Sequence, residues 1–440
     1  MRSRIGSLSR GRRSAAAGKI EALADTFTAS LSRRERSLGP LVATRAARAL
    51  LPALNVGLAL IVVPGLAQPF STPKLWWLLA CALVAAGLSL LSPEPRTIAP
   101  AARQASWLSL GWLGSVLLSA LAAGAADPAA LGRDAAAAVL VIALLRFRPD
   151  PSTTLRAIAF AGALVAASVL LQWAGVDLFS AHATGRLRLH GTLGNPDFAA
   201  AWLGAALPLT VCEAIASGKA HHDSRRRLLL ASASLQVGAL AAIGSLATVI
   251  SLVAAALVLG FGSRKKILPA WIAIGVLAAL GAVQREPGRA LQGRLYLHRV
   301  ALPHLIEAPL LGQGPGAIRL LWPAWEEARK RTAAEAPFVA AQDHVHDDWL
   351  ERALDLGLPS ALCLAALAAL SIGCAIRLGR AQSGPAALRR LAAGAALAGL
   401  CARAFVDFPL ARPAELGLFA TLIALALAPP EEPCPSPERP

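Results

Sequence analysis

The chain has 440 residues, of which 56% are hydrophobic and only 16% are charged. A soluble domain carries roughly 25% charged residues, so this composition excludes an ordinary soluble protein. The formal net charge of +17 raises the question of a nucleic-acid partner. The Lys and Arg residues lie mostly in an N-terminal tail and in short connections, however, and no RNA-binding motif accompanies them. We therefore expect no nucleic-acid partner.

Cysteine usage also narrows the class of protein. Five of the six cysteines lie in or beside apolar runs, and none forms a CxxC pair. Cysteine in such runs behaves as a small hydrophobic residue. The sequence therefore predicts neither a disulfide framework nor a metal cluster.

Apolar stretches of helical length recur along the chain and predict an all-α, polytopic membrane protein with about twelve transmembrane helices. Residues 1–48 form a basic tail that we expect to be disordered. Residues 49–429 form the transmembrane domain, and residues 430–440 form a Pro-rich tail. The expected spans are Ala49–Ala67, Leu75–Leu91, Ala105–Ala123, Asp134–Leu145, Leu155–Val176, Phe198–Ser217, Leu228–Gly244, Ser245–Gly262, Ile267–Val283, Leu354–Ile376, Leu391–Ala404 and Leu416–Leu427.

The distribution of basic residues predicts how these spans are oriented. Every connection that follows an even-numbered span is basic, whereas the short connections on the other face are nearly free of Lys and Arg. Cytoplasmic loops carry the Lys and Arg excess, so both termini should be cytoplasmic. Three segments then face outward: Asp177–Asp197, Arg285–Leu350 and Val406–Glu415.

The loop at residues 285–350, between the ninth and tenth spans, is by far the longest connection. Loops beyond about 12–15 residues are usually functional or disordered. Apolar residues such as Trp322 argue for order. The stretch Ala317–Ala334 predicts a short amphipathic helix, with Leu320, Leu321 and Trp325 on its apolar side.

In the first outward segment, Arg186 and Arg188 depart from the usual placement of basic residues. The planar donor fork of Arg suits phosphate oxygens. Gly194–Asp197 then forms a turn with a cap for the sixth span. The alternative interpretation is a pair of ordinary interfacial arginines before a helix entry.

The long loop carries Arg294 and Arg299, followed by the glycine-rich stretch Leu310–Gly316. Glycines at alternating positions allow backbone N–H groups to face an anion. Such a pattern is weak by itself, and a simple tight turn is the better interpretation of it.

The segment His344–Leu350 holds two histidines, His344 and His346, among carboxylates. A metal site is not favoured, because the histidines lack helical i, i+4 spacing and no cysteine accompanies them. A histidine can instead take a proton from a hydroxyl nucleophile. Asp343, Asp347 or Asp348 would orient the imidazole. The alternative is a pair of surface histidines that cap the tenth span.

Arg403 lies at the end of the eleventh span. An ionisable residue at membrane depth is a functional candidate by default. Arg403 and Asp407 could, however, simply pair with one another.

Three elements in order, Gly191–Asp197, Gly293–Gly316 and His344–Leu358, resemble the O-antigen ligase and O-antigen polymerase superfamily of bacterial envelope glycosyltransferases. The resemblance implies transfer of a glycan from undecaprenyl pyrophosphate to a hydroxyl of a lipid A-core sugar or of another glycan. The reaction would occur on the periplasmic face of the bacterial inner membrane, with no metal or other cofactor. The resemblance also implies that Arg294 binds the diphosphate and that His346 is the base. Further contacts to the diphosphate would come from Arg186, Arg188, Arg299 and Arg403. Residues that support the base would be His344, Asp347 and Asp348.

The chain departs from the superfamily pattern at one turn. Family members usually carry Ser-Arg-Gly between the seventh and eighth spans, whereas this chain has Gly244–Thr248 with no arginine. Either Arg186 or Arg188 covers the missing diphosphate contact, or the activity is altered.

A polymerase of the same superfamily and a protein O-glycosylating enzyme remain alternatives. A transporter of lipid-linked glycans is a third, but transporters place ionisable residues near the bilayer midplane. Here the ionisable residues gather in one outward loop, which favours an enzyme.

Overall fold

The structure is a computed structural model that describes residues 48–91, 99–123, 126–146, 150–176, 189–218, 223–262, 287–328 and 342–428, with a few single positions between them. Three predictions fall outside the described residues: the ninth span, the C-terminal tail, and the two arginines Arg186 and Arg188. Almost all of the N-terminal tail lies outside them as well.

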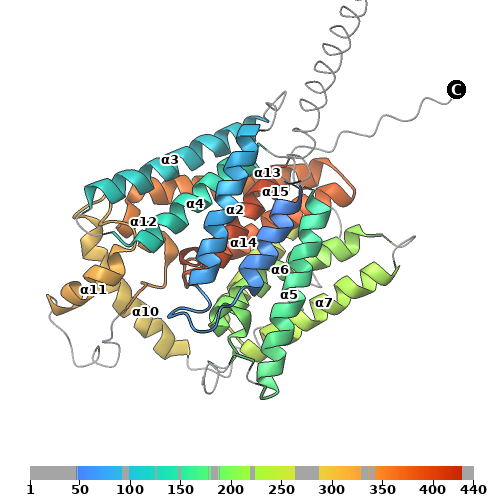
Figure 1. The fold of residues 1–440 in the computed structure, drawn as a ribbon, viewed down its shortest axis with the longest axis horizontal. Helices are drawn as coiled ribbons and strands as arrows, with labels where there is room; N and C mark the ends of the chain where they lie inside the picture. The colour runs from blue at the N-terminus through green and yellow to red at the C-terminus, as the bar shows by residue number, and fades with distance from the viewer. Residues whose placement is uncertain are drawn as a thin grey trace, which may run out of the picture.

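The described residues form helices and no strand (Figure 1). The first helix is Arg48–Leu60. The others are α2 (Thr72–Leu91), α3 (Pro100–Ala122), α4 (Pro128–Leu144), α5 (Pro151–Trp173), α6 (Pro196–Ala216), α7 (Asp223–Ile243), α8 (Leu246–Gly262), α10 (Pro287–Ala301), α11 (Ala317–Glu327), α12 (Asp348–Leu356), α13 (Leu358–Ala381), α14 (Pro385–Arg403) and α15 (Pro413–Ala426), with short 3-10 turns η2 (Gly191–Leu193), η3 (Leu302–Leu305) and η5 (Pro409–Ala411).

Local sequence explains where several of these helices begin. Helices α4, α5 and α6 each start with a proline directly after a capping residue, namely Asp127, Asp150 and Asn195. Each cap side chain accepts a hydrogen bond from a backbone N–H of the first turn, and proline needs no partner at that position. The predicted entry turn before the sixth span is therefore confirmed, with Asn195 as the cap.

Helix α14 lies at the centre of the helical domain, where it packs against α6, α8 and α13 (Figure 1). The core around it holds fully buried aromatic side chains, among them Trp202 and Phe419. Helices α14 and α8 approach closely, because a β-carbon on Gly399 would lie 2.8 Å from the Ser251 carbonyl oxygen. The centre of the domain is thus densely packed.

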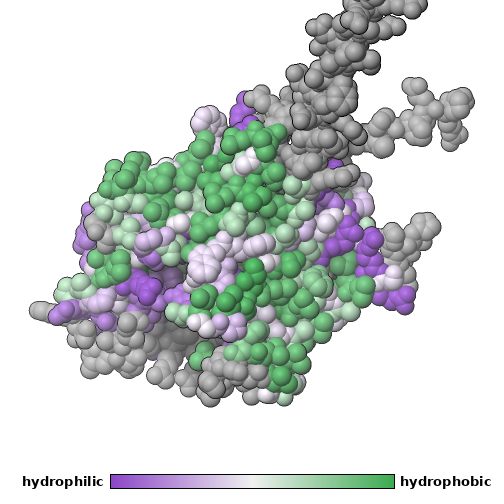
Figure 2. Space-filling view, viewed as in Figure 1, coloured by the Kyte–Doolittle hydropathy of each residue, from purple (hydrophilic) through white to green (hydrophobic). Residues whose placement is uncertain are grey.

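Large apolar side chains also cover the outside of the helical domain. Leu90 and Leu121 are each 83% exposed, and Trp107 is 69% exposed. Figure 2 shows the resulting apolar surface, with hydrophilic residues gathered beside α10 to α12 and, on the other side of the molecule, near the start of α7. Soluble proteins rarely expose apolar surface on this scale. Six described helices, α2, α3, α5, α6, α7 and α13, are long and apolar enough to cross a bilayer.

The prediction of a helical membrane protein is therefore confirmed, while the number of twelve spans stays a prediction. The tenth expected span differs in its start. The chain breaks at Gly357, whose φ is +84°, so Asp348–Leu356 forms the separate short helix α12 before α13. The amphipathic helix after Gly316 is present as α11 and ends at Glu327. Trp325 is buried and Leu321 is partly buried, as expected, whereas Leu320 is 51% exposed. Ile318 and Trp322 complete the buried face.

Candidate functional site

Residues of the predicted long loop and of α12 form a small core of their own at one end of the helical domain (Figure 1). Tyr296 of α10, Trp322 of α11 and Leu354 of α12 pack together around Val345. The Tyr296 hydroxyl donates a hydrogen bond to the buried Glu326 carboxylate at 2.5 Å. This packing holds the histidine segment between α10 and α12.

The two histidines differ in conformation and in their partners. Among the described residues, His346 is the one non-glycine residue with a positive φ, at +56°. Strained backbone of this kind persists where surrounding structure enforces it, and it gathers at functional sites. His344 is held in a different way, since its Nδ1 lies 2.8 Å from the Glu351 carboxylate.

The carboxylates expected to orient an imidazole have other contacts. Asp347 caps α12 by accepting hydrogen bonds from the N–H groups of Trp349 and Leu350. Asp348 is fully buried and accepts from the Leu410 N–H at 2.7 Å. Asp343 is exposed and lies 3.6 Å from Arg319. His344 is held instead by Glu351, which the sequence analysis missed because His344 lies before the helix that carries Glu351. Asp347 lies 3.9 Å from a different imidazole, that of His298.

A single aromatic ring connects the histidines to the turn between α14 and α15. Phe408 stacks on His344 at 4.1 Å and meets His346 edge-on at 4.7 Å. The Arg412 guanidinium lies 4.8 Å from the same ring. Segments separated by about sixty residues therefore share one site.

The arginines predicted to bind a diphosphate have different environments. Arg294 is half-buried and forms no hydrogen bond or ion pair among the described residues, yet it lies near enough to His346 to lower the pKa of that imidazole. Arg299 is 65% exposed and lies 3.8 Å from Glu335.

Arg403 is fully buried with its donors engaged. It bonds to Asp407 at 2.6 Å, to the Thr248 hydroxyl at 3.1 Å and to the Asp197 carbonyl oxygen at 2.8 Å. The alternative that Arg403 and Asp407 pair with one another is thus what the structure shows.

A buried cluster of charged residues, formed by Arg133, Asp134 and Arg352, packs beside the site. The sequence analysis missed this cluster. Arg352 of α12 pairs with Asp134 of α4 and donates to the Leu410 carbonyl oxygen at 2.6 Å. Arg133 also pairs with Asp134, at 2.8 Å, and donates to the Ala411 carbonyl oxygen at 2.6 Å. The cluster ties α12, α4 and η5 to one another.

The glycine-rich stretch is a tight turn, as the sequence favoured, and its donors face a carboxylate of the protein itself. Asp355 of α12 accepts hydrogen bonds from the N–H groups of Gly316 at 3.0 Å and Ile318 at 3.3 Å. The N–H groups of Gln313 and Gly314 donate to α12 carbonyl oxygens. The turn therefore fixes α12 in place.

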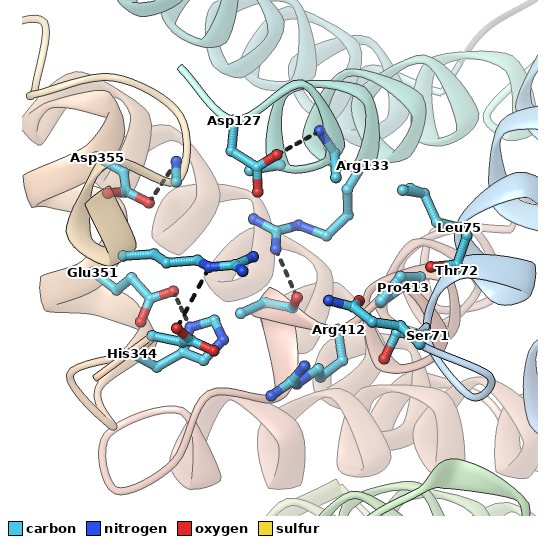
Figure 3. A pocket seen from close by; sticks show the side chains of 17 residues that line it. Ser71, Thr72, Leu75, Asp127, Arg133, His344, Glu351, Asp355, Arg412 and Pro413 are labelled. Atoms are coloured by element: carbon cyan, nitrogen blue, oxygen red, sulfur yellow. Dashed lines mark hydrogen bonds and ion pairs between the residues drawn. The ribbon is translucent and has the colours of Figure 1, made fainter. Parts of the chain in front are cut away.

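Figure 3 shows the cavity between these elements and the start of α2. It contains about 810 Å³ of empty space, part of it open to solvent. The polar and charged side chains that line it include Gln68, Ser71, Thr72, Asp127, Arg133, Arg319, Asp343, His344, Glu351, Asp355 and Arg412. His344 and Glu351 lie on one wall, while His346 and Arg294 lie outside the lining.

Burial shifts several ionisation equilibria at this site. Burial lowers the pKa of His346, and the charge of Arg294 lowers it further, against the opposing effect of Asp407. Burial and the charge of Glu351 raise the pKa of Asp355 to about 8. Burial opposes ionisation of Glu351, but His344 and Arg352 hold its pKa below the ordinary value. At neutral pH the site thus combines a neutral His346 with an ionised Glu351. Within the described residues, no three His, Cys, Asp or Glu side chains are grouped as a metal site.

Residues 231–365 match the family model described as O-antigen ligase. This part of the chain, about a third of its length, is similar to O-antigen ligases. The match confirms the predicted resemblance to the O-antigen ligase superfamily and indicates a glycosyltransferase-like enzyme. No curated protein matches the chain.

The matched part begins within α7 and ends within α13. It includes Arg294, both histidines and Glu351. Phe408, which contacts both histidines, and Arg412, which lies over the Phe408 ring, are beyond the match. The site is thus completed by a segment outside the matched residues.

Proposed function

We propose that this protein transfers a glycan from undecaprenyl pyrophosphate to a hydroxyl of a lipid A-core sugar, at the periplasmic face of the bacterial inner membrane. The observation that carries the proposal is the pairing of a neutral, strained His346 with a nearby Arg294 that has no anionic partner among the described residues. A base with an arginine close enough to affect its pKa, and with no anion paired to that arginine among the described residues, suits displacement of an anionic leaving group.

In the proposed reaction, the acceptor hydroxyl gives its proton to His346 as the oxygen attacks the anomeric carbon of the donor sugar. The bond between that carbon and the diphosphate oxygen breaks, and undecaprenyl pyrophosphate leaves with the bonding electrons. Arg294 stabilises the negative charge that develops on the diphosphate. The lipid diphosphate is already an activated leaving group, so the proposal calls for no metal and no soluble nucleotide sugar.

The other candidates take supporting roles in this proposal. His344, fixed by Glu351 and stacked on Phe408, holds the ring that also contacts His346. Asp347 and Asp348 position the start of α12, and Arg403 secures the turn around Asp197. Arg186, Arg188 and Arg299 remain predicted contacts to the diphosphate, and the cytoplasmic placement of both termini remains part of the proposal.

The test is a transfer assay in membranes that lack an endogenous enzyme, with lipid-linked glycan as donor and lipid A-core as acceptor. His346→Ala is expected to lower the rate by about 100- to 10,000-fold, the usual contribution of a general base. Arg294→Ala should lower it by about 100- to 1,000-fold, the usual cost of one donor to a developing charge. Matched controls are His304→Ala, which removes a histidine bonded to Glu307 on the same loop, and Arg146→Ala, which removes an exposed arginine.

Capped lipid A-core made by the wild type and both controls, but not by the two site variants, supports the proposal. Longer lipid-linked glycan without capping would reassign the enzyme as a polymerase. Transfer at the wild-type rate by both site variants would contradict the assigned roles.

The pH dependence of kcat/KM gives a second prediction. His346 must be neutral to accept a proton, and burial disfavours its charged form, so the neutral form persists to lower pH. The rate should stay constant as pH falls through 6.5, the ordinary value for His, and should drop only below it. A midpoint of the acid limb at or above 6.5, or the same limb in the residual activity of His346→Ala, would contradict His346 as the base.

A further inference from the structure

Arg412 is a partly buried arginine held by aromatic rings rather than by carboxylates. Its guanidinium carbon lies 4.1 Å from the centre of the Phe198 ring and 4.8 Å from that of the Phe408 ring. Among the described residues it forms no hydrogen bond or ion pair, and its Nε is buried without a partner. Figure 3 shows its side chain on the wall of the cavity, near His344.

Other arginines in the described helices, buried or partly buried, have polar partners. Arg352 pairs with Asp134, Arg403 with Asp407, and Arg389 bonds to Glu213 at 2.6 Å. The buried Arg390 donates to the Gln382 side chain at 3.1 Å. A buried charge is costly unless it is paired and hydrogen-bonded. Arg412 departs from this pattern, so the protein keeps a cation whose donors are available to a ligand.

The rings fix the orientation of this cation. Stacking on an aromatic face stabilises a guanidinium and leaves the N–H donors at its edge free to bond. Phe408, one of the two rings, also contacts His344 and His346. Arg412 is thereby held in the same aromatic cluster as the proposed base.

The charged side chains that line the cavity are compatible with a bound anion. Arg133 lines the cavity beside Arg412. The cavity is lined by four carboxylates. Glu351 is engaged by His344, Asp343 lies 3.6 Å from Arg319, and Asp127 accepts the Ala129 N–H as the cap of α4. Burial raises the pKa of the fourth, Asp355, to about 8.

We infer that Arg412 binds a phosphate group of the lipid diphosphate and acts with Arg294 as a second cation at the leaving group. This inference rests on the proposed function and goes beyond it, because it assigns the diphosphate to a site formed by η5 and the start of α15 and not only by the long outward loop. Guanidinium groups bind phosphate oxygens through two parallel hydrogen bonds.

Direct binding to the full-length protein in nanodiscs tests the assignment. The probes are undecaprenyl pyrophosphate, undecaprenyl phosphate and inorganic pyrophosphate, so that lipid and free sources of phosphate are compared. Arg412→Gln is expected to weaken binding of undecaprenyl pyrophosphate by about 10- to 100-fold, which corresponds to one charge-assisted hydrogen-bonding group. Arg412→Lys should recover part of the loss, and Arg146→Gln should bind as the wild type does.

Steady-state kinetics of glycan transfer distinguish a role of Arg412 in donor binding from a purely structural role. Arg412→Gln should raise the KM for the donor while the KM for the acceptor stays within about twofold, and the thermal midpoint in detergent should match that of the wild type. If Arg412→Gln proves unstable, the test is made with Arg412→Lys, which should stay folded and should have a raised KM for the donor.

The outcomes separate this inference from the proposed function. Unchanged diphosphate binding in Arg412→Gln, with normal binding and transfer by the wild type, would overturn the role of Arg412 and leave the proposed function standing. Equal loss for the donor and the acceptor would also overturn it. A wild type that neither binds undecaprenyl pyrophosphate nor transfers glycan would overturn the proposed function itself.

Discussion

Replacement of Arg352 with Met is expected to destabilise the folded protein by about 3–5 kcal/mol and to abolish glycan transfer. Removing one partner of a buried ion pair leaves an uncompensated charge, and costs of this size are usual. Here Asp134 would keep only Arg133 as a partner, and the Leu410 carbonyl oxygen would lose a donor at 2.6 Å. The nearby charges of Asp348 and Glu351 would also lose a cation. Denaturant titration in mixed micelles measures the free energy of unfolding.

Two variants serve as controls for Arg352→Met. One is the triple variant that adds Asp134→Leu and Arg133→Met: because Asp134 also pairs with Arg133, all three charges must be removed together, and part of the stability should then be recovered, since apolar replacement of buried ion pairs is often tolerated. Arg319→Met removes an arginine that is 56% exposed and lies 3.6 Å from Asp343, and it should cost at most about 1 kcal/mol. If Arg352→Met were as mild as Arg319→Met, the cluster would not support the site as argued.

Gly357→Ala is the second substitution expected to have a large effect. Gly357 has φ +84° and ψ 161°, a backbone region that is essentially restricted to glycine and costs other residues about 1–3 kcal/mol. A β-carbon there would lie 2.1 Å from the Leu310 carbonyl oxygen. The glycine-rich turn would have to move away from α12, with loss of the Gln313 and Gly314 hydrogen bonds to that helix.

The expected result for Gly357→Ala is a protein at least about 2 kcal/mol less stable, with transfer reduced more strongly than stability alone explains. Gly373→Ala is the matched control in the following helix, since a β-carbon on Gly373 would have no neighbour within 4 Å. In a helix interior that change should be neutral or stabilise by up to about 1 kcal/mol. A stable, active Gly357→Ala protein would show that the turn does not need this close approach.

Much of the helical architecture could be predicted because it depends on local sequence. Apolar runs mark the membrane helices, and Asn195 followed by Pro196 marks the start of α6. The break between α7 and α8 falls at Gly244, which has φ +57°. The start of the tenth expected span was wrong because hydrophobicity continues across Gly357, and only the backbone conformation reveals that the helix ends there.

The candidate site was predicted only in part, for a different reason. The histidines and Arg294 belong to short motifs, but their partners are distant in sequence: Asp134 lies 218 residues before Arg352, and Phe408 reaches the histidines from the last outward turn. No local pattern encodes such contacts. The same holds for Arg412, which lies against the ring of Phe198. The residue before Phe198, Asp197, accepts a hydrogen bond from the Ser245 hydroxyl at 2.9 Å. Ser245 belongs to the turn that lacks the arginine expected from the superfamily pattern.

The distribution of the site over two stretches of chain limits how this enzyme can be recombined. Residues 231–365 carry the histidines, whereas the aromatic ring that they contact and the carbonyl oxygen that receives Arg352 come from residues 408–410. A chimera that exchanges the first stretch alone would place a foreign histidine segment on an unmatched ring. Exchange of donor or acceptor preference between homologues should therefore require both stretches to move together, as one functional unit that is discontinuous in the gene.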